Sequence, residues 1–278
     1  MRKIKIVADS SCDLFKLAHT EFTTTPMKII TKEKEFVDDP ALDVADMVDY
    51  LYHYKGRSKS SCPNTADWMD AFGDADEIFC VTITSGLSGS YNSACAAKQI
   101  YESENEGKRV HVFDTLSAGP EITLIIEKIE ECIQQGMSFE DIRDCVAAYM
   151  KKTGLVFMLK SLKNFANNGR VSPIVAKLVG IAGICIVGKA SNEGTLEPMH
   201  KCRGEHRSLE TLVKDLEAEG FRSGKISIGH CQNESAAEQL KELILAKFKN
   251  VQIEIHKFRG LCSFYAEKGG VLIGFEKN

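Results

Sequence analysis

A serine- and glycine-rich stretch, residues 84–93, offers the clearest chemistry in the sequence. It reads Thr-Ser-Gly-Leu-Ser-Gly-Ser-Tyr-Asn-Ser and holds two glycines and four serines. Serine hydroxyls donate hydrogen bonds and can cap a helix, and glycine lets the backbone approach a ligand closely. The stretch contains neither a Walker A sequence nor a Gly-x-Gly-x-x-Gly pattern, so it favours a small anionic group over a nucleotide.

The segments on either side predict how this stretch is positioned. Residues 77–84 are short, apolar and rich in β-branched side chains, which is typical of a buried strand. Residues 93–100 contain good helix formers and no helix breaker. A strand, loop and helix in this order direct backbone N–H groups and the positive end of the helix dipole at one point, which favours an anion. A capped strand–helix turn that binds no ligand would look the same.

Polar residues follow other predicted strands as well. Residues 3–8 form an opening strand that ends at Asp9 and Ser10. Open α/β sheets place ligand-binding groups at such strand ends, although a plain helix cap explains both residues equally well. The polar segment 58–65 is predicted as a loop stiffened by Pro63.

The first half of the chain alternates strands and helices. It contains a predicted hairpin over residues 25–37 and a further strand at 109–114. Apolar spacing and capping residues predict helices at residues 43–54, 65–73, 121–135 and 138–154. This alternation indicates a mainly parallel sheet with helices on both faces.

The second half has a different pattern. A strand at 155–159, a helix to residue 168 and a loop at 169–173 precede paired strands at 183–187 and 195–201. Helices at 205–219 and 234–248 then alternate with strands at 225–230, 251–256 and 270–275. We therefore predict two docked α/β domains. Residues 1–152 form a Rossmann-like parallel-sheet layer, and residues 153–278 form a mixed sheet with helices.

Composition limits the classes of protein to consider. The chain has 278 residues, of which 44% are hydrophobic and 27% are charged, and its net charge is −4. These values are those of a globular protein and do not suggest nucleic-acid binding. No apolar run reaches the ~18 residues of a membrane span, and the N-terminus lacks a signal-peptide pattern. We expect a cytoplasmic protein, with at most a transient membrane contact.

Metal and catalytic motifs are missing from the sequence. Ten cysteines include no Cys-x-x-Cys pair, and the seven histidines form no His-Glu-x-x-His pattern, so we expect no metal site and no cofactor. The nucleophile elbow Gly-x-Ser-x-Gly is also missing. Cys62 and Cys95 flank the serine-rich stretch and are expected to be loop and core residues rather than nucleophiles.

Taken together, four motifs resemble those of the DegV family of bacterial fatty-acid-binding proteins, over essentially the whole chain. The opening strand ends in Asp-Ser-Ser, and residues 60–63 are similar to the family's Thr-Ser-x-Pro. Residues 85–93 are similar to its Ser-x-Leu-Ser-Gly-Thr-Tyr-x-Ser, and residues 168–172 to its Gly-Gly-Arg-Ile/Val-Ser. The motifs occur in order and at family-like spacing.

The resemblance implies a long-chain fatty acid buried between two domains. It implies that the carboxylate is held by Ser60 and Ser88, with Ser60 keeping the hydroxyl of the family threonine. It also places Arg170 near the mouth of the site, in contact with a partner or phosphate, although a structural ion pair is an alternative. Neighbouring motif residues are expected to support the site: Asp9, Ser10, Ser61, Ser85, Gly89, Ser90 and Ser93.

The physical chemistry of a fatty acid agrees with this site. A carboxylate buried without a cation needs several hydrogen bonds, which two hydroxyls and helix-start N–H groups can supply. Each buried CH2 contributes about 0.8 kcal/mol, so a chain of about sixteen carbons can be held tightly. The protein itself would catalyse no reaction.

The resemblance further implies that the protein presents its lipid to a separate ATP-dependent fatty acid kinase, which makes the acyl phosphate. One departure bears on this step. The family's C-terminal Gly-x-His-x-Gly-Pro-Gly is replaced over residues 263–270, where Ala266 is the expected equivalent of the histidine. A lipid sensor without a kinase partner, or a small-molecule transferase or hydrolase, therefore stays open.

Overall fold

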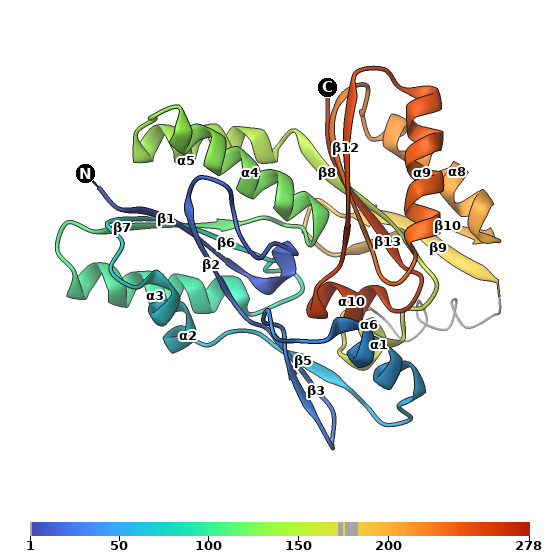
Figure 1. The fold of residues 1–278 in the computed structure, drawn as a ribbon, viewed down its shortest axis with the longest axis horizontal. Helices are drawn as coiled ribbons and strands as arrows, with labels where there is room; N and C mark the ends of the chain where they lie inside the picture. The colour runs from blue at the N-terminus through green and yellow to red at the C-terminus, as the bar shows by residue number, and fades with distance from the viewer. Residues whose placement is uncertain (1, 172–174, 176–182) are drawn as a thin grey trace.

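A parallel sheet lies at the centre of the first half of the chain in the computed structural model, which describes residues 2–171, 175 and 183–278 (Figure 1). Its strand order is β2-β1-β6-β7. The strands are β1 (Ile4–Asp9), β2 (Glu21–Thr25), β6 (Glu77–Thr82) and β7 (Arg109–Asp114). All three strand pairs are parallel.

Helices cover both faces of this sheet, as the alternating pattern predicts. On β6, Ile78 and Cys80 pack in one apolar cluster with Trp68 and other residues of two helices, α2 (Thr65–Phe72) and α3 (Ser90–Glu104). Phe79 and Val81, which point the other way, belong to a separate cluster. That cluster includes residues of α4 (Pro120–Gln134) and α5 (Phe139–Met150). Because successive side chains of a strand face opposite sides, an unbroken apolar run lets both faces be buried.

The second half of the chain forms a six-stranded mixed sheet in the order β10-β9-β8-β13-β11-β12. One face of it is covered by α8 (Glu205–Ala218) and α9 (Glu234–Lys247). The last strand in sequence, β13, lies between β8 and β11 and is antiparallel to both. The strands are β8 (Thr153–Leu159), β9 (Ile184–Ala190), β10 (Leu196–Arg203), β11 (Gly224–His230), β12 (Val251–Lys257) and β13 (Val271–Glu276). The predicted fold class, a parallel-sheet layer docked on a mixed sheet, is confirmed.

Helix α4 lies between the two large sheets. Its side chains from Ile122 to Ile126 are all buried. The start of α4 touches β13 directly, because a Cβ added to Gly274 would lie only 2.4 Å from the backbone nitrogen of Glu121. Glycine therefore allows the two halves of the molecule to pack backbone to backbone at this point.

A third, small antiparallel sheet lies beside α1 (Val44–His53), in the order β4-β3-β5. Its strands are β3 (Lys28–Ile30), β4 (Glu35–Val37) and β5 (Lys59–Ser61). Ile29 of β3 shares an apolar cluster with Phe157 and Phe264 of the second half. The small sheet thus packs against the second half of the chain, on α10 (Gly260–Ala266). The expected domain division at residue 153 coincides with the start of β8 and stays a prediction.

The structure corrects the sequence analysis at three short elements. Residues 59–61 form a strand where a loop was predicted, because three polar residues on a sheet edge carry no apolar alternation. Strand β2 and helix α10 were not predicted. Residues 172 and 173 of the predicted loop lie outside the described residues. Within the described ranges, no helix has both the length and the apolar character needed to cross a membrane.

Candidate ligand-binding site

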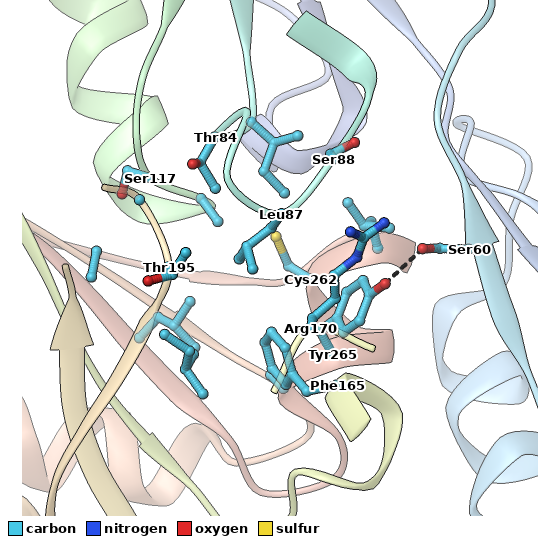
Figure 2. A pocket seen from close by; sticks show the side chains of 18 of the residues that line it. Ser60, Thr84, Leu87, Ser88, Ser117, Phe165, Arg170, Thr195, Cys262 and Tyr265 are labelled. Atoms are coloured by element: carbon cyan, nitrogen blue, oxygen red, sulfur yellow. Dashed lines mark hydrogen bonds between the residues drawn. The ribbon is translucent and has the colours of Figure 1, made fainter. Parts of the chain in front are cut away.

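A cavity of about 300 Å³ lies between the parallel sheet and the mixed sheet (Figure 2). This volume is at the lower end of the range for small-molecule sites, roughly 300–1,000 Å³. The cavity is lined by the serine-rich loop, β5, the face of β8 and α10, among others. Both halves of the chain therefore supply its walls.

The floor of the cavity is an apolar strand face. Leu155, Phe157 and Leu159 occupy alternate positions of β8 and all three line the cavity. Opposite Phe157 in the neighbouring strand β9 is Gly188. A Cβ on Gly188 would lie 2.6 Å from the Phe157 ring, so glycine makes room for the ring. Period-two alternation thus produces a continuous apolar surface along β8.

Polar side chains gather at one side of the cavity. The Ser60 Oγ and Tyr265 hydroxyl oxygens are 2.7 Å apart and share a hydrogen bond (Figure 2). Burial raises the pKa of Tyr265, while Ser60 and the guanidinium of Arg170 act in the opposite direction. The phenol therefore stays protonated and can donate a hydrogen bond. Arg170 lines the cavity yet is exposed, which places it at an opening.

Ser88 lies beside this polar side, just before α3. Helix α3 begins at Ser90, and its first N–H donates to Ser88 Oγ at 3.2 Å. The Ser88 hydroxyl, half-buried, keeps its own hydrogen available for an acceptor in the cavity. It also lies at the positive end of the α3 dipole, where a negative charge is stabilised.

Asp9 holds the serine-rich loop in place without lining the cavity. The buried Asp9 carboxylate accepts hydrogen bonds from Ile83 N at 2.9 Å and Ser90 Oγ at 2.6 Å. Its other oxygen accepts from the backbone N–H and the hydroxyl of Ser11. Burial raises the pKa of Asp9, and these donors oppose the rise. Asp9 also caps a short 3-10 turn, η1 (Ser10–Cys12), so capping and loop support are both present.

The remaining predicted residues divide between the cavity wall and its surroundings. Ser61 and Gly89 line the cavity together with Ser60, Ser88 and Arg170. The others make contacts elsewhere: Ser10 Oγ accepts from Met27 N at 3.1 Å, Ser93 Oγ donates to the Pro63 carbonyl at 2.8 Å, and the exposed Ser85 donates its N–H to Asp114 at 3.0 Å.

The sequence analysis missed several lining residues, of which Tyr265 matters most. Tyr265 lies in α10, where the family histidine is replaced. Ala266, the expected equivalent of that histidine, also lines the cavity, but the neighbouring tyrosine is the residue that reaches Ser60. Thr84, Ser117 and Thr195 line the cavity too, away from Tyr265 in Figure 2. In the sequence, the polar residues 114, 115 and 117 that follow the strand at 109–114 are the signal that could have identified Ser117.

The lining residues offer apolar surface, hydroxyl groups, thiols and a cation. The lining residues that the structure describes include two thiols, Cys62 and Cys262, and no histidine that could activate them. Burial raises the pKa of Cys262 well above its ordinary value, so this thiol is unreactive. In the described part of the chain, no group of three or more His, Cys, Asp or Glu residues is arranged to hold a metal ion. An apolar floor with hydroxyls and a cation at one side suits an amphipathic anion.

Comparisons with known proteins identify the family. A family model described as "Uncharacterised protein, DegV family" matches residues 3–278. A DegV domain-containing protein of Streptococcus pneumoniae is 42% identical over 276 residues, which is 98% of both chains.

Two similar solved structures carry fatty acids. A DegV family protein from Eubacterium eligens, loaded with heptadecanoic acid, has a TM-score of 0.97 and 43% identity, covering 99% of this chain and 100% of the other. The Fatty Acid Kinase B3 protein of Streptococcus pneumoniae, loaded with linoleic acid, has a TM-score of 0.97 and 42% identity, covering 100% of both chains. With its fold, four motifs and full-length match in agreement, this chain belongs to the DegV family.

Proposed function

We propose that this protein binds a long-chain fatty acid in the cavity between its two large sheets, with the carboxylate held by Ser60 and Ser88. The observation that carries the proposal is the combination of an apolar floor along β8 with hydroxyl groups gathered at one side. A fatty acid has the same division between one charged group and a long apolar chain. The ligands of the two similar structures, heptadecanoic and linoleic acid, support this assignment.

The head group meets more donors than the sequence analysis expects. Tyr265 stays protonated and supplies a third hydroxyl beside Ser60. Arg170 adds a guanidinium near that hydroxyl, so a carboxylate here need not be matched by neutral donors alone. Because Arg170 is exposed, solvent screens its charge, so the guanidinium favours the ionised acid over its protonated form while the hydroxyls make the buried contacts.

The protein then hands the bound lipid to a separate ATP-dependent fatty acid kinase and performs no phosphoryl transfer itself. Two observations support this second step. One close relative is named as the B3 protein of a fatty acid kinase. Arg170 is exposed at the cavity opening, where a partner protein could reach the carboxylate. Without a kinase, the same binding site would serve a lipid sensor.

Mass spectrometry of the purified protein tests the binding step. Denaturation should release a fatty acid, and the delipidated protein should bind added palmitic acid in a calorimetric titration. If it releases none and binds none, the protein is not a fatty acid carrier. Formation of acyl phosphate with a cognate kinase and ATP then separates a carrier from a sensor.

A further inference from the structure

A second cavity, of about 430 Å³, adjoins the first. Two residues, Leu155 and Ala190, line both cavities. They face each other across two neighbouring strands, because the pairing of Val156 with Lys189 continues to these two residues. These two residues therefore lie on the boundary between the two spaces.

This pair lies at the end of the cavity remote from Ser60 and Tyr265. Along β8 the floor runs from Leu159 through Phe157 to Leu155. Leu159 shares an apolar cluster with Phe165 and Tyr265, whereas Leu155 is four residues away along the strand. Ala190 ends β9 and leads to Thr195, which lies on the opposite side from Tyr265 in Figure 2. The four-residue separation corresponds to roughly 13 Å of strand.

The two cavities differ in chemistry. The second is lined by charged side chains that include Lys151, Lys189, Glu219 and Lys277. Lys189 Nζ and Glu219 Oε1 are 2.8 Å apart, so this space contains an ion pair. An apolar chain end that passed Leu155 would leave apolar contacts and meet charged groups.

We propose that Leu155 and Ala190 form a partition that stops the acyl chain and thereby sets the longest fatty acid this protein binds. This inference rests on the proposed function, since it concerns the chain of the same ligand. The Leu155 side chain blocks the way from the first cavity to the second. The small side chain of Ala190 leaves the space that Leu155 occupies. Removing the Leu155 side chain joins the two cavities, and enlarging Ala190 shortens the first.

Competition binding to the delipidated protein tests the partition. The measured quantity is the affinity for behenic acid relative to palmitic acid. Leu155→Ala should raise this ratio by about tenfold, because the space vacated by the leucine side chain buries additional CH2 groups before the chain reaches the charged residues. The matched control is Leu159→Ala, which removes the same side chain from the same strand but does not border the second cavity. It should leave the ratio at the wild-type value.

Two smaller substitutions, one that shrinks and one that enlarges a side chain of the partition, test the affinity ratio independently. Leu155→Val should raise the ratio and Ala190→Val should lower it, with melting temperatures measured to show that both variants are folded. Equal ratios in the wild type and both valine variants, or equal ratios for Leu155→Ala and Leu159→Ala, would overturn the partition while the proposed function stands. A wild-type protein that binds neither acid would refute the proposed function itself.

Discussion

Two buried carboxylates four residues apart, Asp9 and Asp13, have opposite surroundings. Asp9 accepts four hydrogen bonds, all from the first half of the chain. Asp13 accepts one from the Arg259 backbone N–H at 2.7 Å and a weaker one from the Cys262 thiol. Its Oδ2 meets no N–H or O–H donor in the described part of the chain and lies 4.0 Å from His256 Nε2. Asp9 is thus satisfied within one domain, whereas Asp13 is incompletely satisfied at the joint between domains.

The two aspartates therefore have different structural roles: Asp9 supports the serine-rich loop, and Asp13 lies at the contact between the two halves of the chain. His256 Nε2 also lacks a hydrogen-bond partner among the described residues, whereas Arg259 Nε lies 3.5 Å from the Asp38 carboxylate. The guanidinium of Arg259 is otherwise well bonded across this joint, because it donates to the backbone carbonyls of Leu14 and Asp38. Asp9 therefore positions the serine-rich loop from within the first half of the chain, whereas Asp13 lies where the second half docks on the first.

The largest expected effect comes from Asp9→Ala. This change leaves Ile83 N, Ser90 Oγ and both donors of Ser11 without an acceptor, so it should lower the free energy of unfolding by about 3–5 kcal/mol. Urea denaturation measures the loss. Asp70→Ala, at an exposed position of α2, is the control and should have little effect. A small loss at Asp9 would mean that the loop is held by other contacts.

Asp13→Asn should change how stability depends on pH. Burial raises the pKa of Asp13 to about 7. Between about pH 4 and 7 the folded state therefore holds a proton that the unfolded state has released. The contribution of Asp13 to the free energy of unfolding falls as the pH rises through this range. Burial lowers the pKa of His256 to about 4, so its contribution rises with pH between about 4 and 6.5. In the wild type the two contributions oppose each other.

Asparagine removes the first contribution and tolerates the left-handed backbone at position 13, where φ is 58°. The free energy of unfolding of Asp13→Asn should therefore rise with pH between about 4 and 6.5, by at most about 1.4 kcal/mol per pH unit more than the wild type. Thermal melting at a series of pH values measures this. Parallel profiles for variant and wild type would show that Asp13 does not titrate in this range.

Ser60→Ala and Ser88→Ala test the proposed carboxylate-binding hydroxyls and leave the Asp9 hydrogen bonds to the loop unchanged. Each should weaken fatty acid binding by about 1–3 kcal/mol, the cost of leaving a buried charged acceptor short of a donor. Isothermal titration calorimetry measures the affinity. Ser85→Ala, in the same loop but outside the cavity lining, should bind like the wild type. If melting temperatures fall and affinity does not, the two serines are structural turn residues.

Arg170→Ala separates lipid binding from presentation of the lipid to the kinase. Acyl phosphate formation with a cognate kinase should fall by about tenfold, which is about 1.4 kcal/mol of barrier. Lipid affinity and melting temperature should change less than in Ser60→Ala, because Arg170 is exposed at the opening. Lys163→Ala, an exposed cation on the nearby α6 (Lys163–Asn167), is the control. Joint loss of stability and lipid binding would instead make Arg170 a structural residue.

Sequence patterns predicted the parts of the fold that are fixed by local periodicity. The buried runs of β1, β6 and β7 and the amphipathic α1 are readable because their apolar residues recur at strand or helix spacing. Strands β2 and β5 could not be predicted because they are short, polar and located at sheet edges. Their pairing depends on partners that no local pattern reveals.

The same distinction applies to the site. Ser60 and Ser88 could be named from short motifs, and both line the cavity. Tyr265 could not, because its contact with Ser60 joins residues 205 positions apart. Gly194 is similar: a Cβ there would lie 2.0 Å from Thr84 Oγ1, and only the packed halves of the chain reveal that constraint. Motifs identify groups, whereas tertiary packing decides which groups meet.

The central place of β13 has a consequence for biosynthesis. Residues 271–276 fill the gap between β8 and β11, so the mixed sheet stays incomplete on the ribosome until these residues emerge. Until then, β8 and β11 present unpaired, apolar edges to which a chaperone or another nascent chain can attach. The parallel sheet needs nothing beyond residue 114 for its strands and can form earlier. The nascent polypeptide therefore acquires its serine-rich loop before it has the completed mixed sheet that forms the floor of the cavity.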